Sequence, residues 1–266
     1  MAVLVIGGIA FYFTRSVGEG GDISLPETDF SKNSGTRVEA LGQMNESQAT
    51  ADYTSLMQLI ETARQSGNID DSEALLCFKK VIYKYAPMLK GWADAHFAQS
   101  SWSSSQVDGY KAQAQKVLSR NVLEANSELV TNLNRVVQVV NDYHAAIAAC
   151  SVGSCTSVSA VNAVISRANS FQDKLLPTDV KNNLAAVPSK AKQALANNIA
   201  ASCRSLANSW SGMSIESFDS RYNSLAARKN EYYNSFGSNS AISSAWSSVE
   251  TAREYVYSAN WDDGGW

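Results

Sequence analysis

The chain has 266 residues, and its hydrophobic content of 45% is enough to form a sizeable core, so we expect a globular protein rather than a disordered tail. Charged residues make up 18% and the net charge is −3, so the chain has no surplus of cations to neutralise a phosphate backbone. We therefore expect no nucleic-acid partner. With only four prolines and 15 glycines, the composition favours helices.

The first 13 residues, Met1 to Phe13, carry no charge. As a helix they would span about 20 Å, which is less than the roughly 30 Å of a bilayer core. No basic residues precede this stretch, so we expect a few residues, including lysines, upstream of Met1. Residues 1–14 would then be a truncated signal anchor that remains uncleaved. The alternative is a buried helix or an incidental hydrophobic terminus.

Arg15, directly after this segment, would by itself keep the rest of the chain in the cytoplasm. One arginine is weak evidence for the orientation in the membrane. We expect the head to lie outside the cytoplasm, in the periplasm or the extracellular space. Residues 15–47 are rich in Gly, Pro, Ser and acidic residues and show little periodicity. They predict a flexible stalk that holds a folded head away from a membrane.

Residues 48–260 predict an all-helical head, because apolar residues recur at alternating steps of three and four. The first stripe runs from Tyr53 to Ala63, and Asp70, Asp71 or Ser72 is expected to cap the next helix. Pro87 falls inside that second helix, where we expect a kink or a restart.

The most regular stripe runs from Leu118 to Tyr143 and predicts one helix from about Gln106 to Cys150. A helix of that length would extend close to 70 Å, and its near-heptad seam indicates coiled-coil-like packing. It would be the spine of the head.

Further helical stripes follow over residues 158–175, 191–210, 218–236 and 242–259, and Pro188 is expected to separate a short helix from the longer one that begins near residue 191. Short connections indicate antiparallel neighbours. The predicted fold is all-α: an elongated antiparallel bundle of about six to seven helices with one long central helix, preceded by the hydrophobic anchor. The head could divide into two subdomains near residues 150–156. Residues 261–266 would form an aromatic tail.

Cys150 and Cys155 bracket a short Gly-containing connection between two helices. They could close a small disulfide loop in an oxidising compartment, or remain free thiols at a helix junction. Cys77 and Cys203 lie on or beside apolar faces, which favours core positions, although the two could also pair with each other. The spacing of the four cysteines matches no zinc-ligand pattern.

Catalytic signatures are missing from the sequence. His96 and His144 each follow an aspartate by two residues, so on a helix the two side chains of each pair point to nearly opposite sides. Glu124 and Glu128 would share one helix face, which we interpret as solvated surface. The sequence therefore nominates no catalytic, metal or cofactor-binding residue, and nothing in it supports an enzyme.

Aromatic residues say more about function in this sequence than the titratable residues do. Tyr232 and Tyr233 are adjacent, so one of them must leave the core stripe, and Trp261 and Trp266 lie beyond the last predicted helix. Aromatic side chains near a surface favour protein contacts. Tyr233, Trp261 and Trp266 are therefore candidate partner-binding residues, the alternative being that they fold back and cap the bundle.

These features lead to one functional hypothesis and two alternatives. The hypothesis is a membrane-tethered, non-catalytic helical binding or scaffolding module of the cell envelope, which binds the membrane through its N-terminal segment and binds a protein partner or a second copy of itself. One alternative is a helical enzyme or ligand carrier with an interhelical pocket. The other is a subunit of a larger helical assembly.

Overall fold

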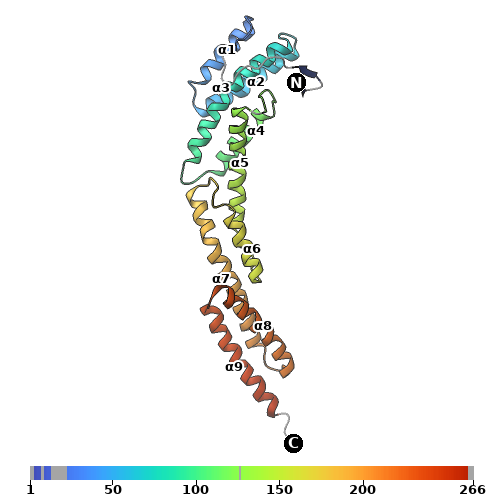
Figure 1. The fold of residues 1–266 in the computed structure, drawn as a ribbon, viewed down its shortest axis with the longest axis vertical. Helices are drawn as coiled ribbons and strands as arrows, with labels where there is room; N and C mark the ends of the chain where they lie inside the picture. Colours follow the sequence, from blue (N-terminus) through green and yellow to red (C-terminus); the bar gives the residue numbers. More distant parts are fainter. Residues whose placement is uncertain (1–2, 7–8, 13–22, 126, 263–266) are drawn as a thin grey trace. The chain divides into compact units, whose positions relative to one another are not determined.

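A computed structural model describes the backbone of residues 3–6, 9–12, 23–125 and 127–262. Over these residues the chain forms nine helices and one two-stranded hairpin (Figure 1). The predicted helical bundle is confirmed, with nine helices in place of six or seven. The helices are α1 (Asp29–Leu41), α2 (Glu46–Gln65), α3 (Asp71–Phe97), α4 (Ser104–Leu118), α5 (Glu128–Ala149), α6 (Val158–Asn169), α7 (Thr178–Asn208), α8 (Ile215–Phe236) and α9 (Ser240–Asp262).

The hairpin consists of β1 (Val3–Ile6) and β2 (Ile9–Tyr12), which pair antiparallel. It lies within residues 1–14, where the sequence predicted a membrane anchor, and its Val and Ile content favours strands. None of the helices in the described part of the chain is both long and apolar enough to cross a membrane. The anchor is thus not confirmed, and the remaining residues of 1–14 lie outside the described residues.

The chain divides into two compact units. Unit 1 comprises Met1–Tyr143 and Leu175–Pro177, and unit 2 comprises His144–Lys174 and Thr178–Trp266. The boundary after Tyr143 lies within α5, before the division near residues 150–156 that the sequence suggested.

In unit 1, α1 occupies residues that were predicted to be a flexible stalk, so that prediction is wrong for residues 29–41. The polar composition was misleading because the small hydroxyl groups are satisfied inside the protein. Ser31 and Ser34 are buried against α3, where Ser31 Oγ donates to Glu73 Oε1 (2.6 Å) and lies 3.6 Å from Cys77 Sγ. Thr28, which caps α1, also donates to Glu73.

The remaining core of unit 1 combines aliphatic side chains, such as Leu56 and Ile82, with several aromatic ones. The rings of Tyr53 and Tyr85 stack with centroids 4.1 Å apart, and both side chains are fully buried. The Tyr85 hydroxyl is 2.9 Å from Thr50 Oγ1, whereas the Tyr53 hydroxyl has no hydrogen-bond partner among the described residues. Tyr110 donates from its hydroxyl to Glu46 Oε2 (3.1 Å).

The long central helix is a second wrong prediction, because α4 ends at Leu118 and α5 begins at Glu128. Asn121 adopts a left-handed conformation with φ of 53°, which asparagine tolerates better than most residues and which an α-helix cannot contain. The apolar spacing continues through this turn, since Val122 is buried there. Spacing alone therefore could not reveal the break.

Neither internal proline ends a helix. Pro87 lies within α3, and Pro188 lies within the 31 residues of α7, so the predicted break at Pro188 is wrong. A proline removes one N–H donor and crowds the preceding turn, but packing along the rest of a helix can outweigh that penalty. In α7 the packing is extensive on both sides of Pro188, with Val187, Ala191 and Leu195 all buried.

Unit 2 is built around α7, which packs against α6, α8 and α9. The apolar stripe of α7 is almost inaccessible from Ala191 to Leu206, and Phe218 of α8 is fully buried against it. Ser214 caps α8 by accepting from Ser217 N (3.3 Å), and Gly237 ends the helix with φ of 85°, a conformation that favours glycine.

The buried tyrosines of unit 1 predict a loss of stability at alkaline pH. Burial raises the pKa of Tyr53 and Tyr85, and burial with the neighbouring Glu46 raises the pKa of Tyr110 to about 12. The stability gained by keeping these phenols neutral is present below about pH 10, the unfolded pKa, and is lost as pH rises through the folded values. Absorbance at 295 nm and far-UV circular dichroism should show a late phase of tyrosine ionisation that accompanies loss of helix.

The variant Tyr110→Phe should weaken the pH dependence between about pH 10 and 12. Ionisation of all 11 tyrosines in one phase near pH 10 with the helices intact would contradict this account.

Candidate functional site

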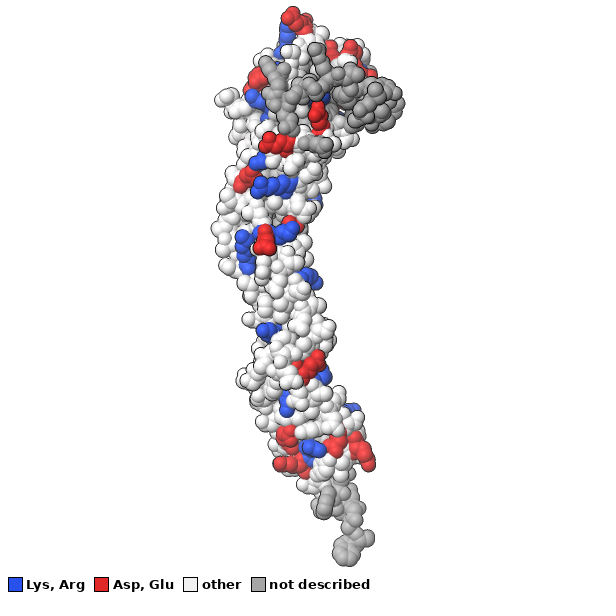
Figure 2. Space-filling model, in the orientation of Figure 1, with Lys and Arg blue, Asp and Glu red and all other residues white. Residues whose placement is uncertain are grey.

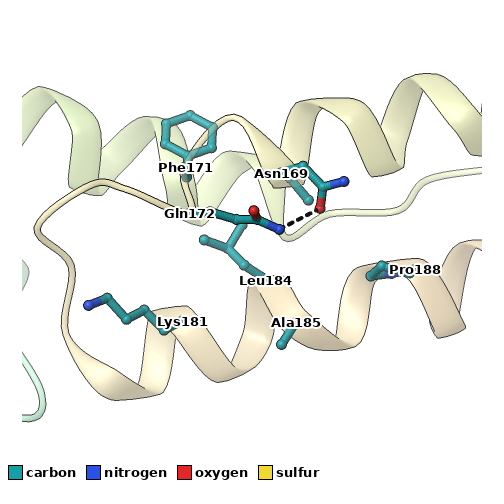
Figure 3. Close-up of a pocket in the computed structure, with 8 residues that line it drawn as sticks. Asn169, Phe171, Gln172, Lys181, Leu184, Ala185 and Pro188 are labelled. Carbon is teal, nitrogen blue, oxygen red and sulfur yellow. Dashed lines mark hydrogen bonds between the residues drawn. The ribbon is translucent and has the colours of Figure 1, made fainter.

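The α6–α7 hollow is the candidate site. It has a volume of about 300 Å³ and lies between the end of α6, the turn that follows it and the first half of α7 (Figure 3). All the residues that line it belong to unit 2: Ala168, Asn169, Phe171, Gln172, Lys181, Leu184, Ala185 and Pro188.

The local sequence explains why a hollow forms there. Ser170 ends α6, with its N–H bonded to the carbonyls of Ser166 and Ala168, and the chain then turns until Pro177 precedes α7. On α7 the lining residues Lys181, Ala185 and Pro188 follow one another at steps of four and three, so they share one helix face. Small Ala185 leaves space that a larger side chain would fill.

The wall of the hollow is mainly apolar and its rim is polar. Leu184 and Ala168 are buried and Phe171 is half-buried. Gln172 Nε2 donates to Asn169 Oδ1 (3.3 Å), while Lys181 extends from α7 at one end of the hollow (Figure 3). Lys181 is exposed and has no ion-pair partner among the described residues.

Pro188 adds a backbone feature. Because proline has no N–H, it cannot donate to the carbonyl of Leu184, four residues earlier, as an ordinary residue of α7 would. Both residues line the hollow. The carbonyl group of Leu184 therefore lacks its usual helical donor.

Unit 1 contains a comparable hollow of about 420 Å³ beside its own helical proline, Pro87. There the charged groups are balanced, since Lys90 Nζ lies 2.6 Å from Asp94 Oδ2 and Glu128 also lines the space. The α6–α7 hollow is different because its cation is unpaired, which makes it the stronger candidate.

A second feature of unit 2 is the α8–α9 seam, a row of half-buried aromatic and charged side chains: Asp219, Tyr222 and Lys229 of α8, and Trp246, Glu250, Arg253 and Tyr257 of α9. Lys229 Nζ lies 4.1 Å from the ring centroid of Trp246, and the guanidinium carbon of Arg253 lies 4.4 Å from that of Tyr222.

Carboxylates complete the seam. Tyr222 donates to Glu250 Oε1 (2.8 Å), and Tyr257 donates to Asp219. Burial raises the pKa of Tyr222, and the hydrogen bond to Glu250 acts in the same direction. Arg253 Nε forms an ion pair with Asp219 Oδ1 at 3.3 Å. Each charged group of the seam therefore contacts an aromatic or oppositely charged neighbour, so the primary effect of the seam is to join α8 to α9.

The aromatic residues singled out from the sequence have different environments. Tyr233 is half-buried beside this seam, and its hydroxyl is 2.9 Å from Ser243 Oγ. Trp261 lies in the last turn of α9, which extends to Asp262, but its side chain and the whole of Trp266 lie outside the described residues. A partner-binding role for these three residues stays a prediction.

The sequence did not single out Tyr255, which is 54% exposed and stacks on Trp210 with centroids 5.4 Å apart.

The four cysteines are free thiols in the structure, and two are those predicted to form a disulfide. Cys150 Sγ donates to the carbonyl of Ala146 (3.3 Å), and Cys155 Sγ donates to that of Val152 (3.7 Å). Burial raises the pKa of Cys150, while nearby Lys190 lowers it. Pairing of Cys150 with Cys155 under oxidising conditions stays a prediction.

The structure does not bring together the acid and base candidates. His96 is buried in unit 1 with its ring 5.7 Å from that of Tyr110, whereas His144 is exposed in unit 2. Glu124 lies in the turn before α5, so it does not share a helix face with Glu128 as predicted. No group of three or more metal-ligating side chains occurs among the described residues.

Comparison of the chain with protein-family models, with curated proteins and with solved structures gave no match.

The seam predicts an energetic coupling between Lys229 and Trp246. In a double-mutant cycle with Lys229→Met and Trp246→Leu, we expect a coupling of about 0.5–1 kcal/mol in the free energy of unfolding, measured by urea denaturation. A control cycle with Arg221→Met and Trp246→Leu should give coupling near zero, because Arg221 is exposed on α8 and has no contact with that ring. Equal coupling in the two cycles would refute the assignment.

Proposed function

We propose that this chain is a non-catalytic helical binding module whose contact surface includes the α6–α7 hollow. The observation that carries the proposal is the combination of an apolar wall with an unpaired Lys181 at the rim. Binding sites typically join an apolar concave surface to a few polar groups that orient the occupant. At about 300 Å³ the hollow is at the lower end of such sites, so it suits one side chain or a small ligand.

The support beneath the hollow is rigid. Leu184 and Val187 anchor the first half of α7 in the protein, and the fully packed stripe from Ala191 onward continues the same helix. Sites on packed helices keep their geometry better than sites on loops. A preformed surface of this kind favours recognition of a partner with little rearrangement.

We extend the proposal to location: the chain is a scaffolding or binding module of the cell envelope, tethered to the membrane by its N-terminal segment, with its helices on the periplasmic or extracellular side. The support for this is the uncharged composition of residues 1–13. Its partner is a protein or a second copy of the chain. A carrier of small ligands is the second candidate, favoured by the size of the hollow.

Site-specific photocrosslinking tests the binding surface. A benzophenone amino acid in place of Asn169, which is exposed at the rim of the hollow, should give a discrete adduct in cells, whereas the same group in place of Ser224, which is exposed on α8, should not. An adduct of twice the chain's mass would identify a second copy. Adducts at both positions, or at neither, would count against a binding surface at the hollow, and a small molecule that copurifies with the chain would then favour the carrier.

Fractionation tests the tether separately. The complete chain should sediment with membranes and resist extraction at high salt, and deletion of residues 2–14 should move it to the soluble fraction, because that segment supplies the apolar surface. Recovery of the intact chain in the soluble fraction would reject the tether but leave the binding surface untouched.

A further inference from the structure

The surroundings of the α6–α7 hollow have a charge bias that the composition of the whole chain hides. Residues 143–172 and 180–215 contain no Asp or Glu, although the complete chain has a net charge of −3, and the seven-residue connection between these stretches contains Asp173, Lys174 and Asp179. The same two stretches contain five cations: Arg167, Lys181, Lys190, Lys192 and Arg204. Figure 2 shows that much of the visible surface over α6 and α7 is uncharged, with scattered basic and acidic side chains.

Two of these cations flank the hollow on one face of α7. Lys181, Ala185, Pro188 and Lys192 follow one another at steps of four, three and four residues, so they form a single stripe along the helix. Lys181 and Lys192 are the ends of this stripe. They are 11 positions apart, which at 1.5 Å per residue places their Cα atoms about 16 Å apart.

Neither lysine is neutralised by a carboxylate among the described residues. Lys181 has no ion pair, and Lys192 lies over the ring of Phe236 with Nζ 5.3 Å from the centroid. An approaching anion would therefore meet two cations separated by an apolar hollow. Charge complementarity of this kind gives specificity and a faster encounter.

The spacing of the two cations defines the occupant. An extended chain rises about 3.3 Å per residue, so roughly five residues cover the distance from Lys181 to Lys192. Such a segment would place one side chain at the hollow between its two ends, and its backbone N–H groups could supply the donor that Pro188 withholds from Leu184. A nucleic acid would need more cations than this stripe offers.

We propose that the occupant of the α6–α7 hollow is an acidic polypeptide segment in extended conformation, with one apolar side chain in the hollow and a carboxylate on each side of it, facing Lys181 and Lys192. This inference rests on the proposed binding function and specifies the class of partner. The recognised pattern is acidic, any, apolar, any, acidic.

The test uses the complete chain and a fluorescein-labelled peptide of sequence Ser-Glu-Ser-Leu-Ser-Glu-Ser, with fluorescence anisotropy at low salt. Two matched peptides carry Lys in place of both Glu, or Ser in place of Leu. We expect binding of the first peptide only. Lys181→Glu and Lys192→Glu should each weaken it about 5- to 10-fold, and Ala185→Trp should abolish it by filling the hollow.

Arg221→Glu is the matched control, because it reverses an exposed charge in the same unit but away from the stripe, and it should change the affinity less than about twofold. The double variant Lys181→Glu with Lys192→Glu should gain binding of the Lys-containing peptide, a result that a misfolded protein could not give.

Equal weakening by Arg221→Glu, or binding that does not depend on the leucine, would overturn the proposal. A different result would also overturn it: the chain binds vesicles of phosphatidylcholine and phosphatidylglycerol, Lys181→Glu abolishes that binding, and the acidic peptide does not bind. A photocrosslinked adduct at position 169 without binding of the acidic peptide would refute this inference and leave the proposed binding function standing.

Discussion

The structure of unit 2 depends on the burial of one apolar stripe along α7. Helices α6, α8 and α9 all pack against this helix, and its residues from Ala191 to Leu206 include several that are almost inaccessible to solvent. Each fully buried aliphatic side chain contributes about 1.5–3 kcal/mol. The combined contribution of several such side chains to the free energy of unfolding exceeds the cost of a proline inside a helix, which is of the order of 3 kcal/mol. This explains why α7 remains a single helix through Pro188. Tertiary packing, and not local preference, decides the length of this element.

The same proline links packing to the candidate site. Pro188 withholds a donor from the carbonyl of Leu184, and the small side chain of Ala185 leaves space beside it. Unit 1 repeats this arrangement at Pro87, where Tyr83 and Pro87 both line a hollow. The two sites differ in charge, since Lys90 is paired and Lys181 is unpaired. A proline inside a helix therefore lies beside a hollow in both units, and the neighbouring side chains decide whether the charges at that hollow are paired.

The sequence predicted the helical class and most helix positions, because stripes such as Tyr53 to Ala63 and Ile242 to Val256 are long and regular. It missed α1, whose buried Ser31 and Ser34 resemble linker residues until their bonds to Glu73 and Cys77 are known. It also missed the hollow, because a concave surface depends on how two helices and the turn between them pack, which the spacing of apolar residues does not show. Pro188, which lies inside the apolar stripe of Leu184, Val187 and Ala191, is the one sequence feature that points to the hollow, but the sequence pattern alone predicts a helix break there.

The α8–α9 seam also constrains how the chain could diverge. Its pairs, from Tyr222 with Arg253 to Tyr233 with Ser243, are placed almost symmetrically about the turn at Gly237. Inserting one residue inside either helix, between Lys229 and Phe236 or between Ser240 and Trp246, would rotate the pairing residues beyond it by about 100° and move them by about 1.5 Å, so the pairs could no longer meet together. Related chains would then tolerate many substitutions in this hairpin but few insertions or deletions inside its two helices.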